Sequence, residues 1–107
     1  MPAVQSRLSF ETLRSQASPF VAYTNLGTPM ANPIRIFKIS NESDAAITVS
    51  YDGGTTDHEH IPANSFVLID ITSNKVWDCQ FCLSVGVQVS IKGTGSGTVY
   101  MSTYYAT

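Results

Sequence analysis

Two short motifs carry the side chains best suited to metal chemistry. His58 and His60 lie two residues apart between acidic neighbours, and Cys79 and Cys82 form a Cys-x-x-Cys pair. Residues two apart on a strand point to one face, so two imidazoles and two thiolates can complete a tetrahedral zinc site. However, the spacing matches no common zinc-finger pattern, and the cysteines lie in an apolar run where a free thiol behaves as a small hydrophobe. We therefore expect no metal and reduced, buried thiols.

No stretch of the chain predicts a catalytic site. Catalysis needs a nucleophile beside a base, or paired carboxylates across a cleft. The chain has neither a nucleophile-elbow nor a phosphate-loop motif, and no motif places a serine near either histidine. Residues 52–57 hold two carboxylates and two glycines, but they lack the dense oxygen ligands of a calcium loop and are interpreted as a strand connector. We expect a non-enzymatic protein without a cofactor.

The composition favours a protein partner. Charged residues make up 13% of the 107 residues, about half the usual share, and the net charge is −2. A surface of uncharged polar groups costs little to desolvate when another protein covers it. The six basic residues are scattered, which argues against nucleic-acid binding, and no apolar stretch approaches the roughly 20 residues of a membrane span. We also expect no signal peptide, because no charged segment followed by an apolar one opens the chain.

Most of the chain is expected to form β-strands. From residue 18 onward, β-branched and aromatic residues form short runs separated by Gly, Asn, Asp and Pro. The expected strands are residues 20–26, 34–40, 46–52, 66–72, 85–92 and 98–105, with weaker ones at 58–61 and 76–81. Alternation in Val87, Val89 and Ile91 puts aliphatic side chains on one face, whereas residues 66–69 are apolar throughout and predict a strand covered on both faces. The pattern indicates an all-β fold, an antiparallel β-sandwich or jelly-roll-like barrel over residues 18–107.

Residues 1–17 form a separate N-terminal segment. Intervals of three and four residues separate Leu8, Glu11, Thr12 and Ser15, and such intervals are compatible with one short helix over residues 9–16. Such a helix would pack on its own sandwich. Alternatively, the segment is an arm that becomes ordered across a neighbouring subunit.

Aromatic residues indicate a contact surface. In the last strand, Val99 and Met101 share one face, while Tyr100 and Tyr104 share the other and lie at a sheet surface. Tyrosine is enriched where subunits meet, but flat rings also suit sugar stacking, so carbohydrate binding is an alternative that would include Trp77. The subunit-interface candidates are three apolar residues of the N-terminal segment and three tyrosines: Leu8, Phe10, Leu13, Tyr23, Tyr100 and Tyr104.

Several runs of the chain resemble small structural proteins of tailed bacteriophages. Residues 28–41 read TPMANPIRIFKISN, residues 47–53 read ITVSYDG, and residues 61–66 read IPANSF. Near the end, residues 89–93 read VSIKG and residues 97–102 read GTVYMS. The resemblance covers residues 23–106.

The resemblance implies a virion component, assembled in the host cytoplasm, that forms homo-oligomers and binds portal, tail or capsid proteins. The leading expectation is a place at the neck, the head-to-tail connection. The alternatives are a capsid decoration protein and a carbohydrate-binding module for host recognition. No direct contact with nucleic acid or membrane is expected.

Overall fold

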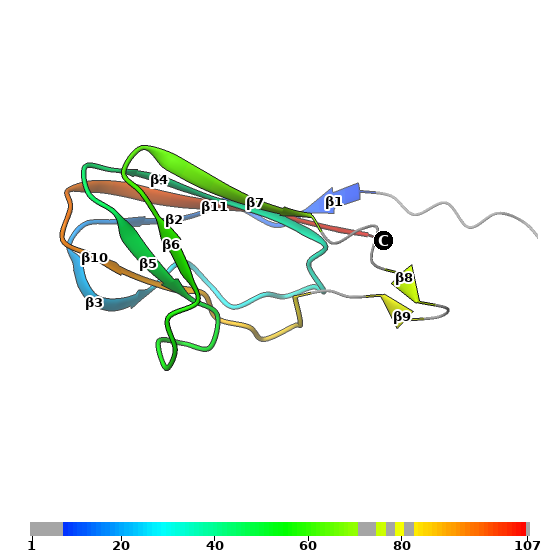
Figure 1. The fold of residues 1–107 in the computed structure, drawn as a ribbon. Helices are drawn as coiled ribbons and strands as arrows, with labels where there is room; N and C mark the ends of the chain where they lie inside the picture. The colour runs from blue at the N-terminus through cyan, green and yellow to red at the C-terminus, as the bar shows by residue number, and fades with distance from the viewer. Residues whose placement is uncertain (1–7, 71–74, 77–78, 81–82, 107) are drawn as a thin grey trace, which may run out of the picture.

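Two antiparallel β-sheets pack face to face in this computed structural model, which describes residues 8–70, 75–76, 79–80 and 83–106 (Figure 1). Sheet I has the order β1-β11-β4-β7, with β2 also paired to β11, and its strands are β1 (Leu8–Phe10), β2 (Arg14–Ala17), β4 (Ile36–Ser43), β7 (Ser65–Asp70) and β11 (Gly97–Ala106). Sheet II has the order β3-β10-β5-β6, with β3 (Phe20–Asn25), β5 (Ile47–Ser50), β6 (Glu59–Ile61) and β10 (Ser90–Gly93). A short hairpin pairs β8 (Lys75–Val76) with β9 (Cys79–Gln80). The predicted all-β, antiparallel β-sandwich is confirmed.

The core lies between the two sheets and follows the period of two. Val49 and Ile91 of sheet II and Val99 and Met101 of sheet I are fully buried. The complete buried apolar set is Phe20, Leu26, Met30, Ile34, Phe37, Ile39, Ile47, Val49, Ile61, Val89, Ile91, Val99 and Met101. Because alternate residues of a strand point to opposite faces, burying this set leaves the other face of each sheet to the surroundings.

The last strand, β11, is paired with other strands of sheet I on both of its sides. It pairs with β4 without interruption from Gly97↔Ser43 to Tyr104↔Ile36, and on its other side with β1 and β2. Val99, Met101 and Thr103 point inward and are buried, whereas Tyr100 and Tyr104 are half-buried on the other face. The expected division of this strand into two faces is confirmed.

The expected helix over residues 9–16 is wrong. Strands β1 and β2 occupy this segment and pair with β11, and no helix that could cross a membrane occurs among the described residues. The physical reason is the free edge of β11, whose backbone groups gain hydrogen-bond partners from a strand but none from a helix. The described part of the segment therefore belongs to the sandwich, and residues 1–7, the rest of the proposed arm, lie outside the described residues.

Three strand predictions need correction. The weaker strand expected over residues 76–81 is wrong, because β8 and β9 share this stretch and pair antiparallel with each other. Phe66 and Leu68 of β7 are 60% and 56% exposed, so this strand is not covered on both faces; β7 is the outermost strand of sheet I, and only Val67 and Ile69 pack against the core. Residues 85–89 precede β10 without joining it, and bond to a proline-containing segment at isolated points, such as Met30 N–H to the carbonyl of Val87 at 3.0 Å. Proline lacks the backbone donor that a continuous ladder requires.

Candidate functional site: the outer face of sheet I

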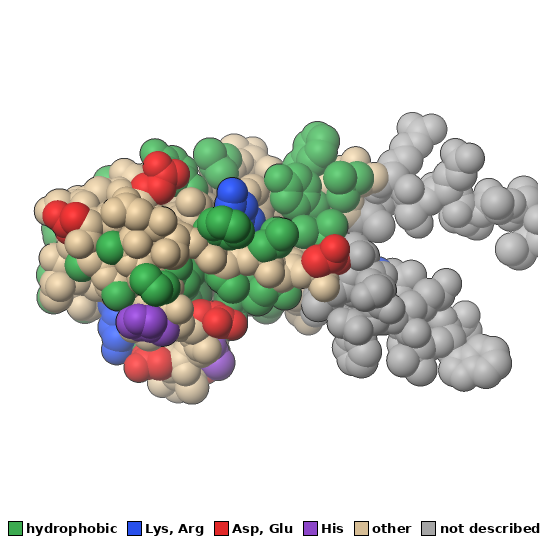
Figure 2. All heavy atoms as spheres, turned by 45° about the horizontal axis from the view of Figure 1, so that its top comes forward, with side chains coloured by type: hydrophobic (Ala, Val, Ile, Leu, Met, Phe, Trp, Pro, Cys, Tyr) green, Lys and Arg blue, Asp and Glu red, His purple; other side chains and the backbone are tan. Residues whose placement is uncertain are grey.

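Exposed apolar side chains gather on the outer face of sheet I. Of the seven large apolar residues that are exposed in the described part of the chain, five lie on this face, with 56% to 66% of their surface accessible: Leu8, Phe10, Leu13, Phe66 and Leu68. Figure 2 shows hydrophobic side chains clustered on this side of the molecule, with a basic side chain among them. Large apolar side chains that are exposed together on one face are typical of interaction sites.

The strand register places these side chains in rows across the face. Tyr104 of β11 lies opposite Ile36 of β4, and the Phe10 ring meets the Tyr104 ring edge to face, with centroids 6.0 Å apart. In the next row, Lys38 lies between Ser102 and Leu68. The face therefore continues from β1 across to β7 without a gap in the sheet.

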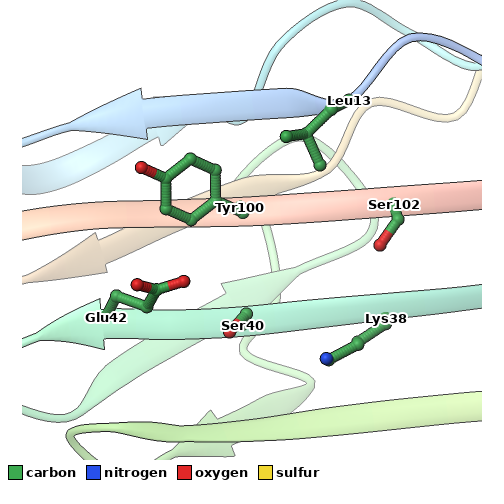
Figure 3. Close-up of a pocket in the computed structure, with 6 residues that line it drawn as sticks. All are labelled: Leu13, Lys38, Ser40, Glu42, Tyr100 and Ser102. Carbon is green, nitrogen blue, oxygen red and sulfur yellow. The ribbon is translucent and has the colours of Figure 1, made fainter.

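A shallow groove of about 300 Å³ crosses the middle of this face. Its lining comes from two strands, β4 and β11, and from the segment between β1 and β2: Leu13, Lys38, Ser40, Glu42, Tyr100 and Ser102. Figure 3 shows Lys38 and Glu42 on either side of Ser40 along β4, with Tyr100 and Leu13 across the groove. The groove offers hydroxyls, one cation, one anion and an apolar wall, which suit a polypeptide surface.

Lys38 is held over the apolar part of the face. Its ammonium lies 4.8 Å from the centre of the Phe66 ring, a cation–π distance. The ammonium thereby covers one side of an aromatic ring that is otherwise largely exposed. The Lys38 charge and the Phe66 ring therefore both remain part of the contact surface.

A buried ion pair beneath the face positions Leu13. Arg14 and Glu11 are both almost fully buried, and Arg14 Nη2 lies 2.5 Å from Glu11 Oε1. Because Arg14 points inward as the first residue of β2, Leu13 before it projects outward into the groove wall. Burial raises the pKa of Glu11, but hydrogen bonds from Arg14 and Asn32, together with the Arg14 charge, outweigh burial and hold the pKa below its ordinary value. Sequence reasoning missed Arg14, since charged residues in a polar segment predict exposure.

Comparison of the chain with protein-family models, with curated proteins and with solved structures finds no match. The assignment of a function therefore depends on the residues and their geometry.

The sixth interface candidate, Tyr23, lies elsewhere. It belongs to β3 of sheet II, donates its hydroxyl hydrogen bond to Asp57, and lies under the Lys92 ammonium, 4.6 Å from the ring centre. Lys92 also lies 3.4 Å from Asp57. Desolvation, followed by the hydrogen bond and negative charge of Asp57, raises the pKa of Tyr23 to about 12. Tyr23 thus belongs to a polar cluster on the other sheet, and only the remaining five candidates share the outer face of sheet I.

Only some of the four residues considered as zinc ligands lie in the described part of the chain. His58 Nδ1 accepts a hydrogen bond from the backbone N–H of Tyr51 at 3.0 Å, and the two rings stack with centroids 5.5 Å apart. His60 is exposed on β6. Within the described residues, no three His, Cys, Asp or Glu side chains are close enough to hold a metal ion. Cys82, Trp77 and the side chain of Cys79 lie outside the described part of the chain.

Proposed function

We propose that this chain is a non-enzymatic structural protein that binds other protein subunits through the outer face of sheet I. The observation that carries the proposal is the gathering of Leu8, Phe10, Leu13, Phe66 and Leu68, each more than half exposed, on one continuous sheet face. Fully burying one such side chain contributes roughly 1.5 to 3 kcal/mol, so a partner that covers all five gains ample binding free energy.

The face has the anatomy of a protein–protein interface. Aromatic anchors, Phe10 and Tyr104, lie at one end, and the serine hydroxyls and opposite charges of the groove lie beside them. Interfaces combine such aromatic anchors with polar groups that find partners across the contact. Sugar stacking has less support, because Tyr23 lies on the other sheet and the tyrosines do not form one platform.

We place this subunit in the virion of a tailed bacteriophage, at the neck between head and tail. One support is the resemblance of residues 28–41, 47–53 and 61–66 to phage structural proteins. The other is a small β-sandwich with exposed apolar side chains on the outer face of sheet I. Many symmetry-related copies bind through repeated modest contacts, which a single apolar face supplies. Its partners are further copies of the chain and portal or tail proteins; decoration of the capsid is the alternative location.

Cryo-electron microscopy and mass spectrometry of intact particles from the encoding phage test this proposal. Density at the neck in portal-related symmetry is the expected result, density across the capsid lattice would favour decoration, and absence of the protein from particles would overturn both.

The contact surface is tested by the double variant Phe10→Ser, Leu13→Ser. Val21→Ser is the control, because Val21 is 70% exposed on sheet II. We expect the double variant to fold but not to join particles, and the control to join them normally.

A further inference from the structure

The outer edge of β7 has the properties that pairing with another strand requires. β7 is the last strand of sheet I, and no other strand of the described residues pairs with its outer side. Its register with β4 runs unbroken from Ile36↔Asp70 to Asn41↔Ser65, so no bulge twists the edge away. The sequence SFVLID contains neither proline nor lysine, the residues with which proteins commonly protect a free edge. Within the described residues, no strand takes up the outward backbone donors and acceptors of residues 65–69, which can therefore pair with a second strand.

We propose that β7 pairs antiparallel with β7 of a second copy of this chain, around a two-fold axis that passes beside Val67. The inference rests on the proposed subunit-binding function and extends it, by naming a second copy as one partner and β7 as the contact. The two copies of sheet I then form one continuous sheet, and their outer faces become one surface.

Side-chain alternation limits the register of this pairing. A two-fold axis perpendicular to the sheet keeps outer faces together, so one residue must lie opposite its own copy. With Val67 at the centre, Phe66 lies beside the partner's Leu68 on the outer face, and this pair occurs twice. With Leu68 at the centre, Phe66 would lie beside the partner's Asp70. The Val67-centred register covers exposed apolar surface with exposed apolar surface and is therefore preferred.

The charges of β7 are compatible with a second copy as the occupant. Asp70 is the only charged residue of the strand, and it lies at one end. In the Val67-centred register, it lies just beyond the end of the partner's β7, which begins at Ser65, and the two Asp70 carboxylates lie at opposite ends of the contact. Lys38 remains over the ring of its own Phe66. No like charges meet across the edge.

This contact is small, and its strength depends on context. A strand of 6 residues buries less than the roughly 800 Å² per partner of a typical stable complex. We therefore expect weak dimers of the isolated chain and a much stronger effect where many copies are held together on a particle. The pairing also doubles the number of exposed apolar side chains that one continuous sheet face offers to a third subunit.

Sedimentation equilibrium of the full chain, over a range of concentrations, tests the pairing with substitutions at two exposed positions. Phe66→Lys and Leu68→Glu each remove one side of the apolar pair, and each is expected to raise the dimer dissociation constant about tenfold. The variant that carries both substitutions places the introduced lysine of each copy beside the introduced glutamate of the other, and it is expected to recover most of the affinity. Val21→Glu on sheet II is the matched control and should leave the dimer unchanged.

The outcomes separate the alternatives. A monomer at all concentrations, or equal loss in the Val21→Glu control, would overturn the β7 contact. If Phe66→Lys strengthens the dimer while Leu68→Glu weakens it, the Val67-centred register is wrong, because lysine would then face Asp70. Thermal unfolding of each variant checks that the monomer still folds. Failure of this contact leaves the proposed function standing if the Phe10 and Leu13 variant still blocks entry into particles.

Discussion

Arg14 Nη2 lies 2.5 Å from Glu11 Oε1, and this nearly buried ion pair fastens the first two strands to the rest of the sandwich. Arg14 also donates from Nε to the carbonyl of Thr28 at 2.8 Å and from Nη1 to the hydroxyl of Thr103 at 3.1 Å. Glu11 Oε2 accepts from the side chain of Asn32 at 2.8 Å. The outer face of sheet I depends on this network, because the network fixes the segment that carries Phe10 and Leu13.

Replacing Arg14 with methionine should destabilise the fold strongly. The substitution keeps much of the side-chain volume but leaves the buried Glu11 carboxylate without its cation, which typically costs about 3 kcal/mol or more. Urea unfolding followed by circular dichroism measures the loss. Lys38→Met removes an exposed cation from the same sheet and should change the free energy of unfolding by less than about 0.5 kcal/mol. Equal effects of the two substitutions would contradict the proposed role of Arg14.

The Glu11 carboxylate makes stability depend on acid pH. Its folded-state pKa lies below the ordinary value of 4.5, so the ionised group stabilises the fold above that pH. This contribution is lost as the pH falls through the lower folded-state pKa. We expect Glu11→Gln to be about 2 kcal/mol less stable than the parent at pH 7, with the difference shrinking below pH 4.5. Thermal melts of both proteins across this range provide the measurement, and a constant difference would rule out the carboxylate as the source.

Gly27 is required by both its backbone angle and its contact with Arg14. Its φ is +70°, and a Cβ added there would lie 2.6 Å from Arg14 Cγ. Gly53 is the matched control, since its φ is +76° but no atom lies within 4 Å of an added Cβ. Gly53→Ala should cost about 1 kcal/mol for the backbone alone, and Gly27→Ala should cost clearly more in the same unfolding assay. Similar losses would mean that the Arg14 side chain moves aside freely.

Asn41 joins two turns of the sandwich from a fully buried position. Its Nδ2 donates to the carbonyls of Ala45 and Ile61 at 2.9 and 3.1 Å, and its Oδ1 accepts from the backbone N–H of Ser43 at 3.0 Å. Asn41→Asp has the same shape but aims a carboxylate oxygen at those carbonyls, so we expect a loss of at least about 3 kcal/mol at neutral pH.

The exposed Asn64 supplies the control for this substitution. Asn64→Asp changes the charge in the same way at a position with φ of 56°, a conformation that Asp tolerates as Asn does, so little loss is expected. Chemical denaturation of both variants at pH 7 tests the pair. A stable Asn41→Asp protein would show that the buried network is dispensable.

Much of the strand pattern could be predicted from local sequence. Alternation assigned the inward side chains Val89 and Ile91 and the inward face of β11 correctly, because a period of two is a property of each strand by itself. The same reasoning went wrong at β7, where four consecutive apolar residues predicted a covered strand. Whether an apolar strand is central or at an edge depends on strand order, which is set by contacts distant in sequence.

Composition and residue alternation were enough to predict the all-β class and the outward tyrosines of the last strand, and they showed the low charge that favours a protein partner. Three facts emerged only from the packing of distant strands: Leu13 and Tyr100 line one groove, Tyr23 belongs to the other sheet, and Arg14 is buried. The reason is distance along the chain: Arg14 and Thr103 are 89 residues apart and become hydrogen-bond partners only when the first strands pair with the last. Local chemistry fixes which way a side chain points within its strand, and the order of the strands fixes what that side chain meets.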